Sequence, residues 1–392
     1  MSDAEKTCPR CGRLLAKHEW KTDTTTGKKF PVCQGEGQKK SRFVKRSRQE
    51  TSTSLKSIPL IGAVSIDRVT DLAQNLGVPI RWAEKIGRLT TVLEEIGNDP
   101  LLNESLVFMG GTPLNFGVFG DEPPRLSYDL DFNFRAPENQ ITPLDMNDVL
   151  ESTHRNLQDL LLRLNYSPES IKYNSRFELG QYKIQYRTLS GVPDTLKIDI
   201  CYSRRIPLLR RKDGVQGDNL INLKMMDNIK IKIPAVEELC GEKIAAFVKR
   251  QFSRDAFDIY NIAKAVERGT MNFKILRKCA LVSICYQEVD PRTVDWDKLF
   301  EKVSLDDYLQ STLTDRNRIT KQQFSQMISK AKTFLKSLYS DFTDDELQYF
   351  DKYFKDGEFH PNLVDPEQDL HPRLANQSEI QWLLSKRNIL TK

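Results

Sequence analysis

Several features that define common protein classes are missing from this sequence of 392 residues. No apolar run approaches the roughly 18–20 residues of a membrane-spanning helix, and the N-terminal stretch is polar, so neither a membrane segment nor a secretory signal is expected. The seven cysteines follow no regular framework, which favours a cytoplasmic protein with reduced thiols over a disulfide-rich secreted one. No serine lies in a nucleophile elbow, and there is no Walker loop.

Histidine is also scarce, with four in the whole chain. Three of them (His154, His360 and His371) are isolated in sequence from other candidate metal ligands, so we expect them to be structural. Metal chemistry, if present, must therefore rest mainly on carboxylates or on the cysteines.

Positive charge is concentrated near the N-terminus. Residues 1–60 contain 14 Lys and Arg against 6 Asp and Glu, a net of +8, whereas the remaining residues contain 45 against 48, a net of −3. A basic arm on a nearly neutral body is typical of a protein that meets a polyanion, but a solvated tail has the same composition.

This arm, residues 1–57, also contains a metal-binding pattern. Two cysteines have zinc-knuckle spacing and a third follows at a distance typical of zinc ribbons, with glutamate where a fourth would stand. The candidate Zn²⁺ ligands are Cys8, Cys11, Cys33 and Glu36, with His18 as an alternative fourth. A small zinc-ribbon-like arm followed by a basic linker is one interpretation, and a degenerate or unstructured segment is the other.

Hydrophobic periodicity divides the rest of the chain into helices and strands. Strands are expected before Gly110 and over residues 126–134, 180–189 and 195–203. Helices are expected over residues 66–77, 79–96 and 145–164, and throughout 234–350.

Two carboxylates share one face of the expected strand 126–134. Because side chains alternate along a strand, Asp129 and Asp131 point to the same side. Asp199 repeats this arrangement in a later strand. If the two strands are neighbours, three carboxylates converge, and their repulsion calls for Mg²⁺; two such ions would stabilise both oxygens of a phosphoryl displacement. Taken alone, such a pair is more often a solvated strand face.

A glycine-rich turn supplies a complementary feature. Gly110, Gly111 and Thr112 end a strand and begin an expected helix, where free backbone N–H groups favour phosphate. The Thr112 hydroxyl could cap that helix or donate to a phosphate oxygen. The same tripeptide is commonly only a turn, so the prediction of a phosphate site depends on its position before the two aspartates.

This order of elements resembles the DNA polymerase beta-like nucleotidyltransferase superfamily. More narrowly, EELCGEKIAAFVKRQFSRDAFDIYNI at residues 237–262 is similar to the Glu-Lys…Arg and Arg-Asp-x-x-Asp motifs of the AbiEii/MenT toxins of type IV toxin–antitoxin systems. Further similar segments are residues 76–97, 342–354 and 371–382. The resemblance covers roughly residues 60–390. It departs from the family pattern in the sixteen residues between Thr112 and Asp129, where GDEPP looks like a small insertion.

The second motif of this family has its own physical interpretation. Lys243 and Arg250 lie along one stripe of the expected helix and present cations in the same direction. The resemblance assigns Lys243 to nucleotide binding, Asp258 to catalysis or its support, and Arg254 and Asp255 to support. Without the resemblance, an ion pair between Arg254 and Asp258, four residues apart on one helix, is the simpler interpretation.

The resemblance implies an α+β fold: a polymerase beta-like core with a mixed sheet at residues 58–233, and a helical domain at residues 234–392. It implies a Mg²⁺-dependent enzyme that moves a nucleoside monophosphate from an NTP to an RNA acceptor, with the tRNA 3′ end as first choice. It further implies a toxin restrained by a separately encoded antitoxin. Two alternatives are a nucleic-acid-binding protein that acts through its zinc-ribbon arm, and a small-molecule nucleotidyltransferase of the antibiotic-modifying kind.

Overall fold

The computed structural model divides the chain into two compact units, Met1–Ser57 and Ile58–Lys392. It describes residues 19–22, 29–32, 64, 66–119, 125–135, 146–176, 178–210, 218–223, 226, 229–312 and 319–390. In the first unit, strands β1 (Glu19–Thr22) and β2 (Lys29–Val32) pair as an antiparallel hairpin. The candidate zinc ligands Cys8, Cys11, His18, Cys33 and Glu36 lie outside the described residues, so zinc binding stays a prediction. A division of the second unit at residue 233 stays a prediction as well.

The second unit is built on a five-stranded mixed sheet in the order β3-β4-β7-β6-β5. Strands β4 and β7 are parallel, and the other neighbours are antiparallel. The strands are β3 (Leu106–Met109), β4 (Leu130–Phe134), β5 (Ile171–Arg176), β6 (Leu179–Arg187) and β7 (Pro193–Cys201). The expected α+β class with a mixed sheet is confirmed. Sequence periodicity missed β5, because this edge strand is largely polar and exposed.

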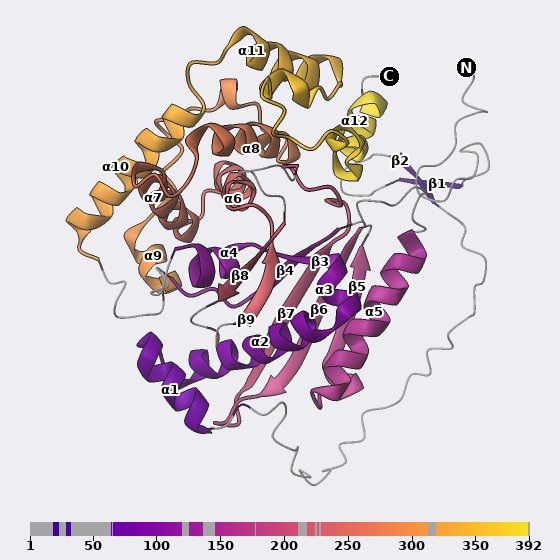
Figure 1. Ribbon diagram of the computed structural model, residues 1–392, viewed down its shortest axis with the longest axis vertical. Helices are drawn as coiled ribbons and strands as arrows, with labels where there is room; N and C mark the ends of the chain where they lie inside the picture. Colours follow the sequence, from indigo (N-terminus) through magenta and orange to yellow (C-terminus); the bar gives the residue numbers. More distant parts are fainter. Residues whose placement is uncertain are drawn as a thin grey trace. The chain divides into compact units, whose positions relative to one another are not determined.

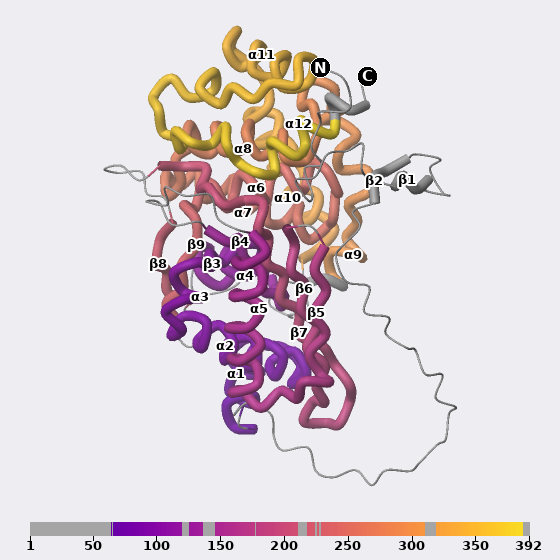
Figure 2. Tube along the Cα trace, turned by 90° about the vertical axis from the view of Figure 1, so that its right-hand side faces the viewer, coloured from indigo at the N-terminus to yellow at the C-terminus, as the bar shows by residue number. Residues whose placement is uncertain are grey.

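Helices cover one face of this sheet (Figures 1 and 2). They include α2 (Ile80–Asn98) and α5 (Met146–Arg163), with α1 (Ile66–Leu76) packed on α2 and the short α3 (Pro100–Ser105) leading into β3. Apolar side chains of the sheet such as Tyr182 and Ile198 are fully buried on this side. His154 of α5 stacks on Tyr173 at 4.0 Å between ring centroids and contacts the Tyr182 hydroxyl at 3.0 Å, in keeping with the structural role expected for it.

A helical region follows the short hairpin of β8 (Asn219–Leu223) and β9 (Ile229–Ile233). Its helices are α6 (Val236–Arg250), α7 (Ser253–Glu267), α8 (Phe273–Tyr286), α9 (Leu305–Thr312), α10 (Lys321–Leu338), α11 (Asp344–Asp351) and α12 (Ser378–Leu390). Close packing of α6 on α8 requires glycine at position 241, because a Cβ there would lie 2.8 Å from the Cys279 Cβ. Within the described ranges, no helix combines the length and apolarity that a membrane span requires.

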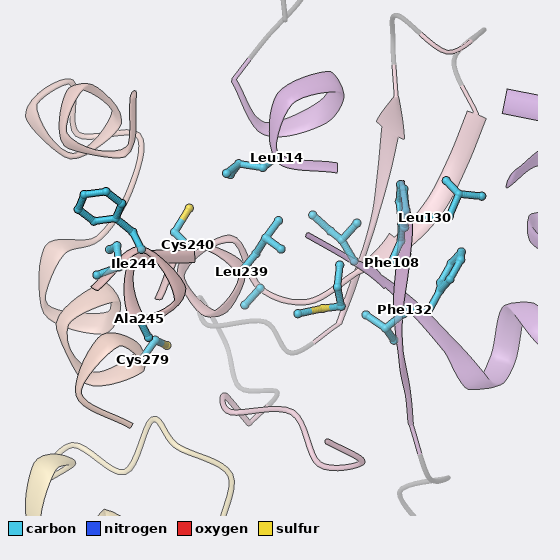
Figure 3. Close-up of a cluster of buried hydrophobic side chains, with 14 of the residues drawn as sticks. Phe108, Leu114, Leu130, Phe132, Leu239, Cys240, Ile244, Ala245 and Cys279 are labelled. Atoms are coloured by element: carbon cyan, nitrogen blue, oxygen red, sulfur yellow. The ribbon is translucent and has the colours of Figure 1, made fainter. Parts of the chain in front are cut away.

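Helix α6 joins this region to the sheet through a shared apolar core (Figure 3). Leu239 and Ile244 of α6 are buried with Phe108 of β3 and Phe132 of β4 in one hydrophobic cluster. The two phenylalanine rings pack at 5.1 Å between centroids. This core fixes α6 beside the ends of β3 and β4, where the predicted site residues lie.

Candidate active site

The turn after β3 lies against the Asp131 carboxylate of β4. Gly110 has a φ of +81°, and a Cβ there would lie 2.3 Å from Asp131 Oδ2, so only glycine fits. At Gly111, a Cβ would lie 2.7 Å from Arg125 Nη2. The helix expected after this turn is the three-residue α4 (Gly111–Pro113), which continues as one π-turn over Leu114–Val118. Phosphate binding here would therefore depend on individual N–H groups more than on a long helix dipole.

Thr112 has a different role from the one expected. The N-cap of α4 is Gly110, and no side chain caps the helix, so the predicted Thr112 cap is wrong. Its buried hydroxyl instead donates a hydrogen bond of 2.8 Å to the backbone oxygen of Asp129. Thr112 thus ties the glycine turn to the residue just before β4, and its hydroxyl proton is already engaged.

The three predicted carboxylates meet in one pocket of about 570 Å³. Asp131 of β4 is directly opposite Asp199 of β7 in the parallel pair, and Asp129 lies immediately before β4. Asp129, Asp131 and Asp199 all line the pocket. The condition on which the sequence argument depended, that the two strands are neighbours, is therefore confirmed.

The electrostatics of this group fit a divalent cation. Burial, together with the charges of Asp129 and Asp199, raises the pKa of Asp131 to about 6. Burial also raises the pKa of Asp199, while Gln181 Nε2, at 3.4 Å from its Oδ1, acts in the opposite direction. Clustered oxygen donors of one sign, with no cation in ion-pair contact among the described residues, are the donor set that Mg²⁺ prefers.

Cationic side chains form the opposite wall of the pocket. Leu239, Lys243, Ala246 and Arg250 line it from α6, so the stripe expected from the sequence is confirmed. Arg254 of α7 lines it too, with its guanidinium 5.7 Å from the centre of the exposed Phe252 ring. An anionic molecule in the pocket would therefore lie between carboxylates on the sheet and cations on the helices.

Behind this wall lies a buried network around Asp255 and Asp258, both with no exposed surface. Lys243 Nζ lies 2.6 Å from Asp255 Oδ1 and 2.9 Å from Asp258 Oδ2. Arg250 Nε donates to Asp255 Oδ2 at 2.6 Å. Burial acts to raise the pKa of Asp255, but Lys243 and Arg250 outweigh it and hold that pKa well below its ordinary value.

Arg125 completes the network from the loop before β4. Its Nε and Nη2 donate to the two oxygens of Asp258 at 2.9 and 2.7 Å. Burial opposes ionisation of Asp258, but Arg125 and Lys243 outweigh it and keep its pKa below the ordinary value. The ion pair between Arg254 and Asp258 that the sequence allowed is not formed. Neither Asp255 nor Asp258 lines the pocket, but both hold cations that do.

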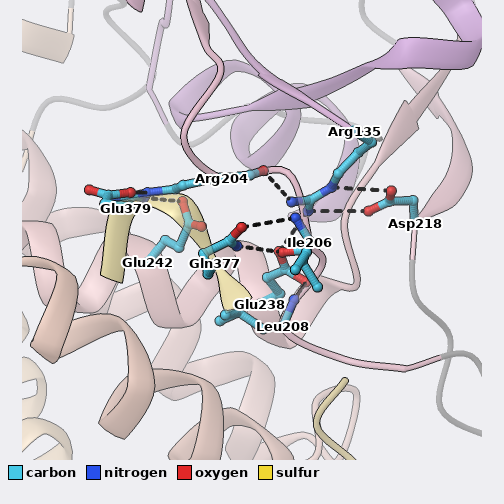
Figure 4. A network of polar contacts seen from close by, with 9 residues as sticks. All are labelled: Arg135, Arg204, Ile206, Leu208, Asp218, Glu238, Glu242, Gln377 and Glu379. Carbon is cyan, nitrogen blue, oxygen red and sulfur yellow. Dashed lines mark hydrogen bonds and ion pairs between the residues drawn. The ribbon is translucent and has the colours of Figure 1, made fainter. Parts of the chain in front are cut away.

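A second polar network holds the loop after β7 (Figure 4). Arg204, which lines the pocket, pairs with Glu242 at 3.0 Å and with Glu379. Gln377 accepts from the Ile206 N–H at 3.1 Å and donates to its carbonyl at 2.7 Å. The segment before α12 therefore fixes the chain that follows Asp199.

A sequence model described as the AbiEii nucleotidyl transferase toxin of type IV toxin–antitoxin systems matches residues 91–356. The chain belongs to the AbiEii family. As an AbiEii protein it is a nucleotidyltransferase toxin, and the resemblance seen in the sequence is confirmed.

Similarity to solved structures is remote. The nucleotidyltransferase toxin MenT4 of Mycobacterium tuberculosis H37Rv is 16% identical, with a TM-score of 0.45 over 79% of this chain and 97% of that one. An antigenic nucleotidyltransferase-like protein of Paracoccidioides brasiliensis is 15% identical, with a TM-score of 0.30 over 56% and 93% of the two chains. A comparison with curated proteins finds no match.

Two arginines of this AbiEii site, Arg125 and Arg204, were not predicted from the sequence, although both line the pocket. They lie in loops, where no periodicity marks a residue. Arg250 also lines the pocket; the sequence placed it on the stripe with Lys243 but assigned it no role. Residues 120–124, which contain the apparent insertion, lie outside the described part of the chain.

A third acidic group lies elsewhere in this AbiEii chain. Asp365, Glu367 and Asp369 approach closely enough to share one cation. Lys278 Nζ already lies within 2.9, 2.5 and 2.7 Å of them, respectively. The ammonium therefore lies among the three carboxylates and compensates part of their charge.

Proposed function

We propose that this protein transfers a nucleoside monophosphate from an NTP to the 3′ end of an RNA, with tRNA as the first candidate, and releases pyrophosphate. The observation that carries the proposal is the direct pairing of Asp131 with Asp199 across β4 and β7, opposite the cations of α6 and α7. A carboxylate group facing a cationic wall suits a ligand that carries both bound metal and negative phosphates.

Asp129, Asp131 and Asp199 would hold two Mg²⁺ ions. Bound there, the ions would lower the charge on the phosphates and stabilise the attacking and leaving oxygens. Asp199, on the central strand of the sheet, would also accept the proton of the attacking hydroxyl.

The triphosphate would lie against the glycine turn and the cationic wall. The amides at Gly110 and Gly111 would donate to phosphate oxygens, and Lys243 and Arg254 would face the charge that develops on the departing pyrophosphate. Asp255 and Asp258 would act as positioning residues, because each already holds two of the cations that the site uses.

A transfer assay tests this proposal. Purified protein is incubated with Mg²⁺, each labelled NTP and total tRNA, and label in RNA is measured with and without EDTA. We expect metal-dependent transfer with at least one NTP. Transfer that is unchanged by Asp131→Asn, or absent with every NTP, would contradict the proposed chemistry.

Regulation by a separately encoded antitoxin fits the family and gives a cellular test. Expression of the wild-type chain should arrest growth, and expression of the Asp131→Asn variant should not. Normal growth with wild-type protein that is demonstrably folded and active in transfer would separate the enzyme from its role as a toxin.

A further inference from the structure

Over β5, β6 and β7, one face of the sheet is covered by no helix of the described residues. Helices α2 and α5 pack on the opposite face (Figures 1 and 2), where Lys85 of α2 pairs with Asp194 of β7 at 3.3 Å. The side chains on this open face are exposed or half-buried in all three strands, whereas those of β6 and β7 on the opposite face are mostly buried. The same face carries Asp199 into the active-site pocket.

Three lysines form a single row across this open face. In the strand register, Lys172 of β5 is opposite Lys183 of β6, and Lys183 is opposite Lys197 of β7. All three are exposed, and none forms an ion pair with another described residue. We call these three residues the lysine row.

The lysine row is electrostatically unfavourable in the free protein. Like charges directly opposite on neighbouring strands repel and destabilise a sheet. Asp199 is the only acidic residue that the described residues of β5, β6 and β7 place on this face. It belongs to the adjacent row, which runs from Asn174 through Gln181 to Asp199 and Asp131. A polyanion beside the active site would relieve the repulsion.

We propose that the lysine row binds the sugar–phosphate backbone of the RNA acceptor as its 3′ end enters the pocket. Strand spacing places the outer lysines about 10 Å apart, so the row can reach successive phosphates of one strand. Contacts of this kind fix position without reading sequence. This inference rests on the proposed function, because it needs a polynucleotide acceptor.

Binding of a short fluorescent single-stranded RNA across a salt series tests the inference. The row variant combines Lys172→Gln, Lys183→Gln and Lys197→Gln. Its matched control combines Lys230→Gln, Lys274→Gln and Lys321→Gln, which remove the same charge from exposed positions outside this face.

Loss of three phosphate contacts should make the slope of log Kd against log salt shallower by about 2. Near 0.1 M salt, this corresponds to a loss of affinity on the order of a hundredfold. The control variant should keep the wild-type slope. The Tm of the row variant should be unchanged or higher, since repulsion is removed. A fall in Tm together with the loss of affinity would make the lysines structural and overturn the proposal.

Other outcomes distinguish failure of this inference from failure of the proposed function on which it rests. If wild-type protein extends RNA but the row variant binds RNA with the wild-type slope, the lysine row does not bind the acceptor and the proposed function stands. If the row variant loses affinity for poly-glutamate but not for RNA, the row contacts an acidic protein and the RNA assignment is overturned. If wild-type protein neither binds nor extends RNA, the acceptor is wrong and this inference fails with it.

Discussion

Two groups of three carboxylates lie in the described part of the chain, and they differ in what faces them. Asp365, Glu367 and Asp369 surround the Lys278 ammonium at ion-pair distance. Asp129, Asp131 and Asp199 face an open pocket and form no ion pair with a described residue, and the Lys243 ammonium that also lines this pocket is held by Asp255 and Asp258. Among the described residues, only the first group has its ligand oxygens within 4.8 Å of one another, whereas the second is the group without an ion-paired cation.

The comparison shows that a close group of carboxylates can be held by a cation of the protein itself. In the first group the protein supplies its own cation, and the cluster joins α8 to the segment before α12. In the second, burial together with the charges of Asp129 and Asp199 raises the pKa of Asp131 to about 6, and a bound cation would relieve this unfavourable energy. The following predictions exploit this difference.

The largest expected effect is on catalysis by Asp131→Asn. Loss of one carboxylate from the active group should reduce transfer on the order of a thousandfold, which corresponds to several kcal/mol of transition-state stabilisation. The paired variant Asp365→Asn should lower stability, because Asp365 also accepts N–H bonds from Asp369 and Leu370, but should keep activity per folded molecule. Labelled transfer and circular dichroism check both. Equal losses of activity in the two variants would show that the two carboxylate groups do not differ in their role in catalysis.

The second prediction removes the ammonium from the structural group. Lys278→Met should cost roughly 3–5 kcal/mol in the free energy of unfolding, because it leaves three carboxylates without their partner. The control Lys274→Met, at an exposed position on the same helix, should change stability by about 0.5 kcal/mol or less. Urea unfolding measures both. If Ca²⁺ restores stability to Lys278→Met alone, the ammonium is what excludes metal from this group.

A third prediction concerns how the stability contributed by the Asp255 carboxylate, which holds Lys243 and Arg250, depends on pH. The pKa of Asp255 is depressed in the folded state, so its contribution to stability is present above the ordinary aspartate pKa of about 3.9 and is lost as pH falls through the lowered value. Wild-type protein should exceed Asp255→Asn by about 2–3 kcal/mol at neutral pH. Urea unfolding should show this gap narrowing below about pH 4; a constant gap would mean that Asp255 is not ionised in the fold.

The smallest effect is expected for Arg254→Gln. Arg254 lines the pocket and forms no ion pair with a described residue, so its removal should leave stability unchanged. Loss of one charge-assisted contact to the triphosphate should raise KM for the NTP about tenfold. Steady-state kinetics measure this, and Arg254→Lys should recover part of the loss. A variant with unchanged KM would place the triphosphate away from α7.

Much of the fold and of the site follows from local patterns in the sequence. The alternation around Asp129 and Asp131 predicted their common side, and the helical stripe predicted that Lys243 and Arg250 face one way; both lead into the same pocket. Polar strands such as β5 gave no clear period, so they were missed. Thr112 was misassigned because a hydroxyl near a helix start has a second acceptor, the Asp129 carbonyl, that only the folded chain brings close.

By itself, the sequence determined which residues share a strand or helix face, because backbone geometry fixes those periods over a few residues. It could not determine which distant segments meet. The Asp131–Asp199 register, the Arg125–Asp258 pair across 133 residues and the enclosure of Lys278 by residues 365–369 all depend on packing of the whole second unit. Whether a carboxylate group binds an internal ammonium or awaits a ligand is therefore a property of the tertiary structure, since charge compensation depends on distance in space.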